Sequence, residues 1–249
     1  MARWCGGVAV IDWLRASDEG PTIELDGRSV PIALTRNARA RRLTMRLAPD
    51  GSAVRITLPR WCRSQEAIAF AAARRQWLEV QLAKVPARAD PVARGTLAYR
   101  GAALAIAWRR EAPRGPRIDG DRVVAGGPEE TLGNRLRRWL ESEAQRLMAA
   151  DLADYCARAD VALPMLRLTR AGQRWGSCST SGTVRVNWRL VMAPDPVRRS
   201  VVAHEVAHLV HFDHGPDFHA LLARLYEGEI AAADAWLRKH GRALYADFG

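Results

Sequence analysis

Residues 194–214 read PDPVRRSVVAHEVAHLVHFDH, and their centre is an HEVAH motif formed around His204, Glu205 and His208. Residues four apart on an α-helix lie one above the other, so His204 and His208 project from one face, where their ring nitrogens can share one zinc ion. Glu205 lies about 100° around the helix, where a carboxylate can accept a proton from an attacking water. The motif therefore predicts two metal ligands and one general base on a single helix.

The residues around the motif indicate that this helix is buried. Asp195 and Pro196 are typical of a helix start, the first as a cap and the second as a residue whose missing N–H costs nothing in the first turn. Five apolar residues flank or interrupt the motif: Val201, Val202, Val206, Leu209 and Val210. Because His and Glu are unusual in a core, their presence here favours a metal site over a surface helix with two unrelated histidines.

A catalytic zinc needs a third protein ligand and one open position. His211 lies on the ligand face, but it follows His204 by seven residues, about 10.5 Å along the axis, which one ion cannot easily span. His214 comes after the chain has had room to turn beside Asp213 and Gly215, so we predict His214 as the third ligand. The alternatives are His219 or, as in a thermolysin-like site, Glu227 or Glu229.

The rest of the chain indicates an α+β protein with a β-rich first part. Alternating apolar residues predict strands at 22–25, 30–34, 43–47, 54–58, 97–108, 117–124 and 165–169. Apolar residues at helical spacing predict helices at 64–84 and 128–160. Residues 183–191 alternate between apolar and polar, which predicts a half-buried strand just before the metal-binding helix.

Length and composition exclude several classes of protein. With 249 residues, 48% of them hydrophobic and 26% charged, the chain is typical of a globular protein and not of a disordered or collagenous one. No apolar run reaches the roughly 18 residues of a membrane span, and residues 1–20 lack a cleavage site, so we expect no membrane partner and no signal peptide.

The cysteines indicate a reducing, cytoplasmic location. Cys5, Cys62, Cys156 and Cys178 lie far apart without a C-x-x-C pair, which predicts neither a disulfide framework nor a thiolate zinc site. Cys178 is expected to be a small buried residue rather than a nucleophile or a removable metal ligand.

The net charge is +11, from 38 Lys and Arg against 27 Asp and Glu. The excess of basic residues lies outside the last quarter of the chain, since residues 195–249 carry 6 basic and 8 acidic side chains. The densest basic stretch contains Arg36, Arg39, Arg41, Arg42 and Arg46. An Arg-rich face can bind nucleic acid through its phosphates, although arginines spread over a solvated surface explain the same charge.

The stretch that contains the motif resembles the YgjP-like family of zinc metallopeptidases, relatives of the SprT-like and WLM zincins. The resemblance includes RWGSCS at 174–179, NWRL at 187–190, the HEVAHL motif at 204–209, His214 and Phe218. Family members usually carry Asn before the third histidine and Trp after the Phe, where this chain has Asp213 and His219. Neither difference replaces an expected ligand.

This resemblance implies a zincin-like core, a small mixed sheet over a metal-binding helix, at 128–249, after a β-rich N-terminal region with one helix at 1–127. In such a core an extended peptide pairs with an edge strand beside the zinc, here 183–191 or the WGSC loop before it. Candidate groups for stabilising the oxyanion or supporting the site are Arg174, His219 and Tyr226.

We therefore expect a cytoplasmic zinc peptidase that acts on a protein or peptide, with His204, His208 and His214 as Zn²⁺ ligands and Glu205 as the base. One alternative is a SprT-like protease that binds DNA through its basic N-terminal part. The other is a non-catalytic zinc module, although such a module has no use for Glu205.

Overall fold

A computed structural model describes residues 20–85, 89–172 and 174–248. Cys5 and most of the N-terminal stretch expected to lack a signal peptide lie outside the described residues. The chain forms two compact units, residues 1–83 and 84–249. The domain boundary expected between residues 127 and 128 stays a prediction.

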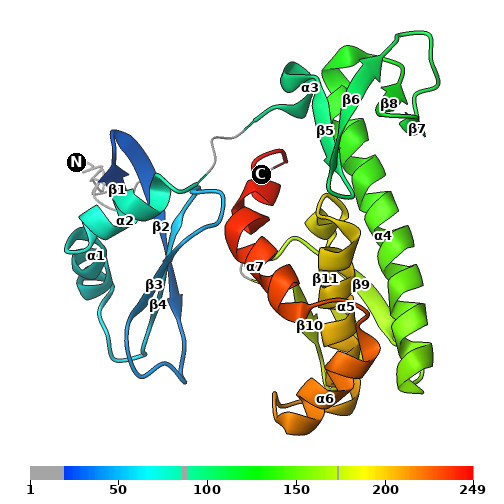
Figure 1. Cartoon of the computed structure of the whole chain (residues 1–249). Helices are drawn as coiled ribbons and strands as arrows, with labels where there is room; N and C mark the ends of the chain where they lie inside the picture. Colours follow the sequence, from blue (N-terminus) through cyan, green and yellow to red (C-terminus); the bar gives the residue numbers. More distant parts are fainter. Residues whose placement is uncertain (1–19, 86–88, 173, 249) are drawn as a thin grey trace, which may run out of the picture. The chain divides into compact units, whose positions relative to one another are not determined.

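In its described residues, 20–83, the first unit contains a four-stranded sheet and two helices (Figure 1). Its elements are β1 (Thr22–Leu25), β2 (Arg28–Arg36), β3 (Thr44–Leu47), β4 (Val54–Leu58), α1 (Ser64–Ala72) and α2 (Arg75–Leu82). The strand order is β1-β2-β4-β3, with β2 and β4 parallel. The four predicted strands are confirmed, whereas the single helix expected at 64–84 is two helices, separated at Ala73 and Arg74.

The second unit begins with a four-stranded sheet and a long helix. The elements are α3 (Pro91–Arg94), β5 (Thr96–Tyr99), β6 (Ala102–Trp108), β7 (Arg117–Asp119), β8 (Arg122–Ala125) and α4 (Leu132–Ala159). The strands expected at 97–108 and 117–124 are each a hairpin, because Arg100-Gly101 and Gly120 take the positive φ angles of tight turns. Gly101 also packs against Pro194, which leaves no room for a Cβ atom.

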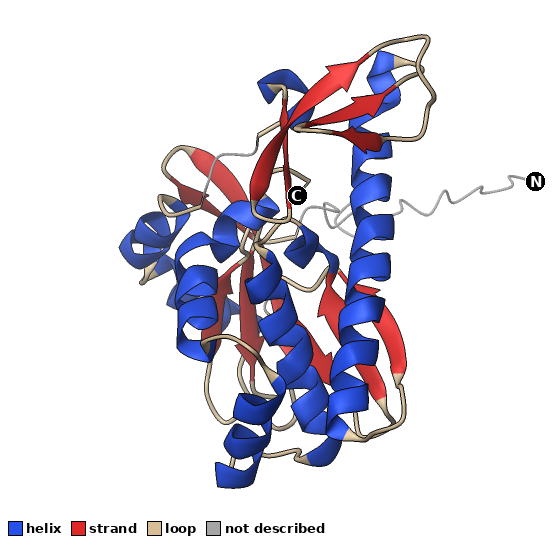
Figure 2. Cartoon of the chain, turned by 45° about the vertical axis from the view of Figure 1, so that its right-hand side comes forward, coloured by secondary structure: helices blue, strands red, loops and turns tan. Residues whose placement is uncertain are grey.

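The remaining elements surround the HEVAH motif. They are β9 (Met165–Thr169), β10 (Gly176–Cys178), β11 (Thr183–Asn187), α5 (Asp195–Val210), α6 (Pro216–Leu225) and α7 (Ile230–His240) (Figures 1 and 2). The sheet order is β10-β11-β9, with β10 antiparallel and β9 parallel to β11. The expected small mixed sheet beside the motif helix is therefore present.

Two predictions about residues 183–191 are wrong: their second half is not a strand, and the strand is not at the edge of the sheet. The strand ends at Asn187 because the Asn187 side chain accepts a hydrogen bond from the Arg189 backbone N–H and caps a 3₁₀ turn, Trp188–Val191. Asn187 and Arg189 are buried, so this segment is not half-exposed. β11 is also the central strand, which leaves β10 and β9 as the edges of this sheet.

Ion pairs attach α5 to α4. Arg198 and Asp151 are both buried, and their Nε and Oδ2 atoms are 2.7 Å apart. Arg199 on the next position contacts Asp151 and Asp154 of α4. Asp195 binds the guanidinium groups of Arg100 and Arg198 and does not cap the helix as expected. These contacts hold the helix that carries the motif in a fixed orientation.

Within the described part of the chain, no helix has both the length and the apolar character needed to cross a membrane.

Candidate metal centre

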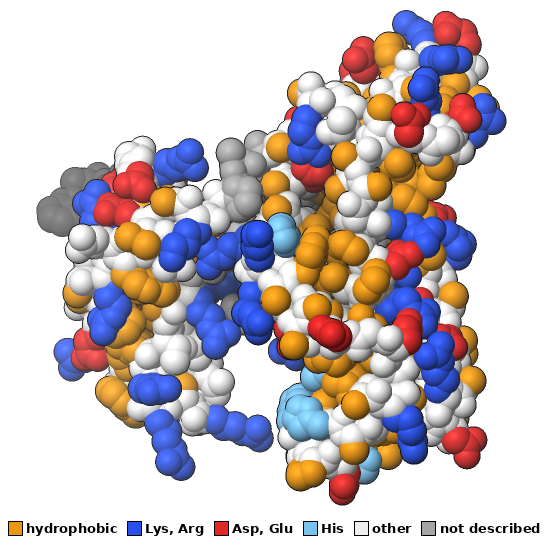
Figure 3. Space-filling model, in the orientation of Figure 1, with side chains coloured by type: hydrophobic (Ala, Val, Ile, Leu, Met, Phe, Trp, Pro, Cys, Tyr) orange, Lys and Arg blue, Asp and Glu red, His pale blue; other side chains and the backbone are white. Residues whose placement is uncertain are grey.

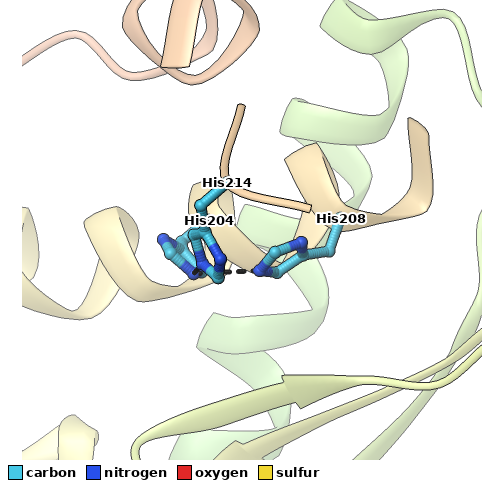
Figure 4. A group of neighbouring side chains, drawn as sticks. All are labelled: His204, His208 and His214. Carbon is cyan, nitrogen blue, oxygen red and sulfur yellow. Dashed lines mark hydrogen bonds between the residues drawn. The ribbon is translucent and has the colours of Figure 1, made fainter. Parts of the chain in front are cut away.

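Three histidine rings converge beside α5 (Figure 4). His204 and His208 project from successive turns of α5, and His214 approaches from the loop between α5 and α6. The Nε2 atom of His204 lies 3.1 Å from Nε2 of His208 and 3.3 Å from Nε2 of His214. The structure thus brings together the three residues predicted as ligands. Figure 3 shows pale blue histidine side chains gathered on one face in the region of α6.

The spacing of these nitrogens fits a metal ion. A tetrahedral zinc with Zn–N bonds of about 2.0–2.1 Å places its ligand nitrogens roughly 3.3–3.4 Å apart. The two measured Nε2–Nε2 distances, 3.1 and 3.3 Å, are close to that value. Imidazole also suits other divalent transition metals, so the three histidines could hold a metal ion, and the geometry does not select the element.

The rings of His208 and His204 are both held in a form that can bind a metal, for different reasons. Nδ1 of His208 lies 3.0 Å from the backbone carbonyl of His211, which can only accept, so Nδ1 carries the proton and Nε2 keeps its lone pair. Burial and the neighbouring histidines lower the pKa of His204 to about 4, which keeps its ring neutral at neutral pH. His211, rejected as a ligand, thus supports the site through its main chain.

Phe218 packs against all three rings, and the motif alone did not assign it this role. Its ring centroid lies 5.0 Å from that of His204, 4.5 Å from His208 and 4.8 Å from His214. The Phe218 side chain is fully buried on α6. This contact could have been predicted from the sequence, because Phe218 follows His214 by four residues and lies in the first turn of a helix that starts at Pro216.

Glu205 points toward β10 and is 4% exposed. A Cβ atom on Gly176 would lie 2.3 Å from Oε1 of Glu205, so only glycine leaves room for this carboxylate. Oε2 of Glu205 has no hydrogen-bond partner among the described residues. Burial raises the pKa of Glu205 to about 7, against a smaller lowering by the positive charge of Arg174. The carboxyl group is thus poised to exchange a proton near neutral pH.

A pocket of about 230 Å³ adjoins His204 and Glu205. It lies between α5, α7 and the start of β10. Its lining is polar and apolar in nearly equal parts, and the remaining residues that line it are Trp175, Gly176, Ser200, Val201, Ile230, Asp234 and Leu237. The two motif residues therefore border a cavity that can admit a ligand side chain.

The sequence matches the family model of the YgjP-like metallopeptidase domain over residues 41–240. The chain belongs to the YgjP-like metallopeptidase family. The resemblance seen in its motifs is thereby confirmed, and membership implies a metal ion and, in general, a peptidase. Searches of curated proteins and of solved structures find no match for the chain.

The three supporting candidates of this YgjP-like chain differ in position. Arg174 is exposed and close enough to lower the pKa of Glu205. His219 is exposed on α6, with its ring against Phe218 at 5.3 Å. Tyr226 lies away from the histidine cluster. Its hydroxyl donates a hydrogen bond to the backbone carbonyl of Pro196 on α5, and Pro196 precedes His204 by eight residues, about 12 Å along the helix axis. The structure does not bring Tyr226 to the histidines.

The alternative ligands also lie apart from the histidine cluster. Glu227 accepts hydrogen bonds from Tyr155, Arg158 and Arg199, and Glu229 is exposed just before α7. The potential ligand atoms that lie within 4.8 Å of one another belong to His204, His208 and His214, and this group includes neither glutamate. Cys178 is also outside this group, and burial raises the pKa of its thiol, which disfavours a reactive thiolate.

Proposed function

We propose that this YgjP-like chain is a zinc-dependent peptidase in which His204, His208 and His214 bind the ion and Glu205 is the general base. The observation that carries the proposal is the convergence of three imidazole nitrogens beside a buried carboxylate, one oxygen of which has no hydrogen-bond partner in the described part of the chain. A bound zinc ion supplies Lewis acidity, which polarises a carbonyl and lowers the pKa of a water.

The burial of Glu205 and its raised pKa support its role as the group that transfers the proton. Its carboxylate accepts the proton of the attacking water and passes it to the leaving amine. A base with a pKa of about 7 can perform both steps near neutral pH. Gly176 of β10 lies directly against this side chain.

β10 is the proposed docking strand for an extended peptide. It is an edge of the sheet, it contains Gly176, and Gly176 faces Glu205. A peptide that added to this edge would use main-chain hydrogen bonds, which give affinity with little sequence preference. The pocket of about 230 Å³ would then take one substrate side chain.

We also propose a reducing compartment, the cytoplasm. Cys62, Cys156 and Cys178 are free thiols in the structure, and cytosolic proteins keep such thiols reduced. The nucleic-acid partner expected from the arginines at 36–46 stays a prediction; it is tested by measuring whether DNA binds at low salt and is released as salt rises.

The peptidase proposal is tested with purified full-length chain, zinc analysis and a peptide library read by mass spectrometry. We expect about one zinc per chain and new peptide termini that disappear with Glu205→Gln, while the zinc content is unchanged. Bound zinc without any cleavage in the wild type would instead identify a non-catalytic zinc module. Full cleavage by metal-free protein would refute the proposal.

A further inference from the structure

A second pocket, of about 620 Å³, lies in the second unit at the start of α4 and contains no residue of the metal centre. Its lining comes from the β6–β7 loop, the segment before α4 and the first two turns of α4: Arg114, Gly115, Pro116, Pro128, Thr131, Arg135, Arg138 and Trp139. This volume falls within the roughly 300–1,000 Å³ of small-molecule sites.

Arg135 is the unusual residue of this pocket. It is 8% exposed, so its guanidinium group is largely removed from water. Nη1 donates to the carbonyl of Pro128 at 2.8 Å and to the hydroxyl of Thr131, whereas Nε and Nη2 have no partner among the described residues. No carboxylate pairs with it there, although a buried charge is costly without a counter-charge. An anion in the pocket would supply that counter-charge.

Two further guanidinium groups reinforce the positive field. Arg114 and Arg138 are exposed, and no acidic side chain lines the pocket. Glu129 and Glu130, which follow Pro128, line a different pocket. Three arginines without a carboxylate match a phosphate dianion better than a singly charged carboxylate, and the guanidinium fork binds phosphate with two parallel hydrogen bonds.

The loop that carries Arg114 is held in place by backbone hydrogen bonds. The N–H of Gly126 donates to the carbonyl of Pro113 at 2.8 Å, and the N–H of Gly127 donates to that of Arg110 at 3.1 Å. Gly127 has a φ of +79° and contacts the side chain of Arg114 so closely that a Cβ atom would lie 2.9 Å from its Cγ. The arginine is thus presented on a preorganised loop.

Apolar groups form the other part of the lining. Trp139 is partly buried, and its ring packs against Tyr99 at a centroid distance of 5.1 Å. Together with Pro116 and Pro128 it offers a surface for a flat group beside the arginines. We propose that this pocket binds a phosphate group carried by a small planar molecule, of which a nucleoside monophosphate is the representative.

The test is calorimetric titration of the full-length chain with adenosine monophosphate, adenosine, inorganic phosphate and a single-stranded oligonucleotide. We expect saturable binding of adenosine monophosphate and at least about tenfold weaker binding of adenosine, which lacks the charge. Inorganic phosphate, which lacks the planar group, should also bind more weakly. Failure of adenosine monophosphate to bind at millimolar concentration would overturn the proposal, as would binding of the oligonucleotide alone, which would assign the site to a nucleic-acid strand.

Matched variants locate the binding. Arg114→Gln and Arg138→Gln should each weaken it about tenfold, whereas Arg117→Gln, an exposed arginine on β7 outside the pocket, should change it less than twofold. Equal losses in all three variants would overturn the assignment. Binding should be the same with and without zinc, because no histidine lines the pocket. Binding that requires zinc would place the ligand at the histidines and overturn the proposal.

Discussion

The substitution Gly176→Ala tests whether the position of Glu205 controls catalysis. A Cβ atom at residue 176 would lie 2.3 Å from Oε1 of Glu205 and 2.7 Å from its Cδ. Since unstrained contacts to carbon need well over 3 Å, the carboxylate must move by about 1 Å. Displacement of a catalytic group by that distance can cost about 100-fold in rate. We therefore expect kcat/KM of Gly176→Ala to fall about 100-fold.

The assay measures cleavage of a peptide selected from the library, together with zinc content and circular dichroism. Zinc content and folding should match those of the wild type, because Gly176 is not one of the three residues proposed to bind the ion and the atoms nearest to its added Cβ all belong to Glu205. Gly133→Ala is the control, since the nearest atom to its added Cβ, on Val92, is at an ordinary 3.8 Å. In a Glu205→Gln background, Gly176→Ala should cause little further loss, because both changes remove the same function. A Gly176→Ala protein that keeps more than half of the wild-type kcat/KM would show that the position of Glu205 does not control catalysis.

Three further predictions concern the ligand loop and the ion pairs. His214→Ala should weaken zinc binding more than about 100-fold, since even the loss of a residue that only orients a ligand costs 10–100-fold; a competition titration with a chelator measures it, and unchanged affinity would exclude His214 as a ligand. Asp151→Ala should lower the free energy of unfolding by about 3 kcal/mol, because it leaves Arg198 buried without its main partner; urea unfolding gives the value, and a loss below about 1 kcal/mol would contradict it. Burial alone would raise the pKa of Glu227, but hydrogen bonds from Arg199 and Tyr155 lower this pKa from 4.5 to about 2. The ionised Glu227 carboxylate therefore adds its full contribution to the free energy of unfolding above pH 4.5. This contribution is lost as the pH falls toward 2. The stability difference between wild type and Glu227→Gln should therefore narrow between pH 6 and pH 3, and a constant difference would contradict the assigned pair.

Much of the local structure follows from the sequence pattern. The strands at 22–25, 54–58 and 165–169 match β1, β4 and β9, because alternation and the turns beside these segments act over a few residues. The spacing of His204, His208 and His214 likewise suffices to predict that they can meet, since one helix and one short turn set their positions.

Features that depend on distant residues did not follow from the pattern. Asn187 continues the alternation of β11, yet its side chain contacts Ala171 and Tyr245 and caps the next turn, so the strand stops there. The position of Asp195 in the sequence is typical of a helix cap. In the structure, however, the β5–β6 hairpin brings Arg100 next to Asp195, and the carboxylate binds that guanidinium group. The close approach of Gly176 to Glu205 joins two elements that the chain order alone does not place together.

The proposed metal centre places one divalent ion between His204, His208 and His214, next to Glu205. Diffraction from crystals of the purified chain, recorded on both sides of the zinc absorption edge, would locate that ion. We expect a single anomalous peak about 2.0–2.1 Å from the Nε2 atoms of all three histidines. A peak at any other group of side chains, or a zinc ion bound without His214, would contradict it.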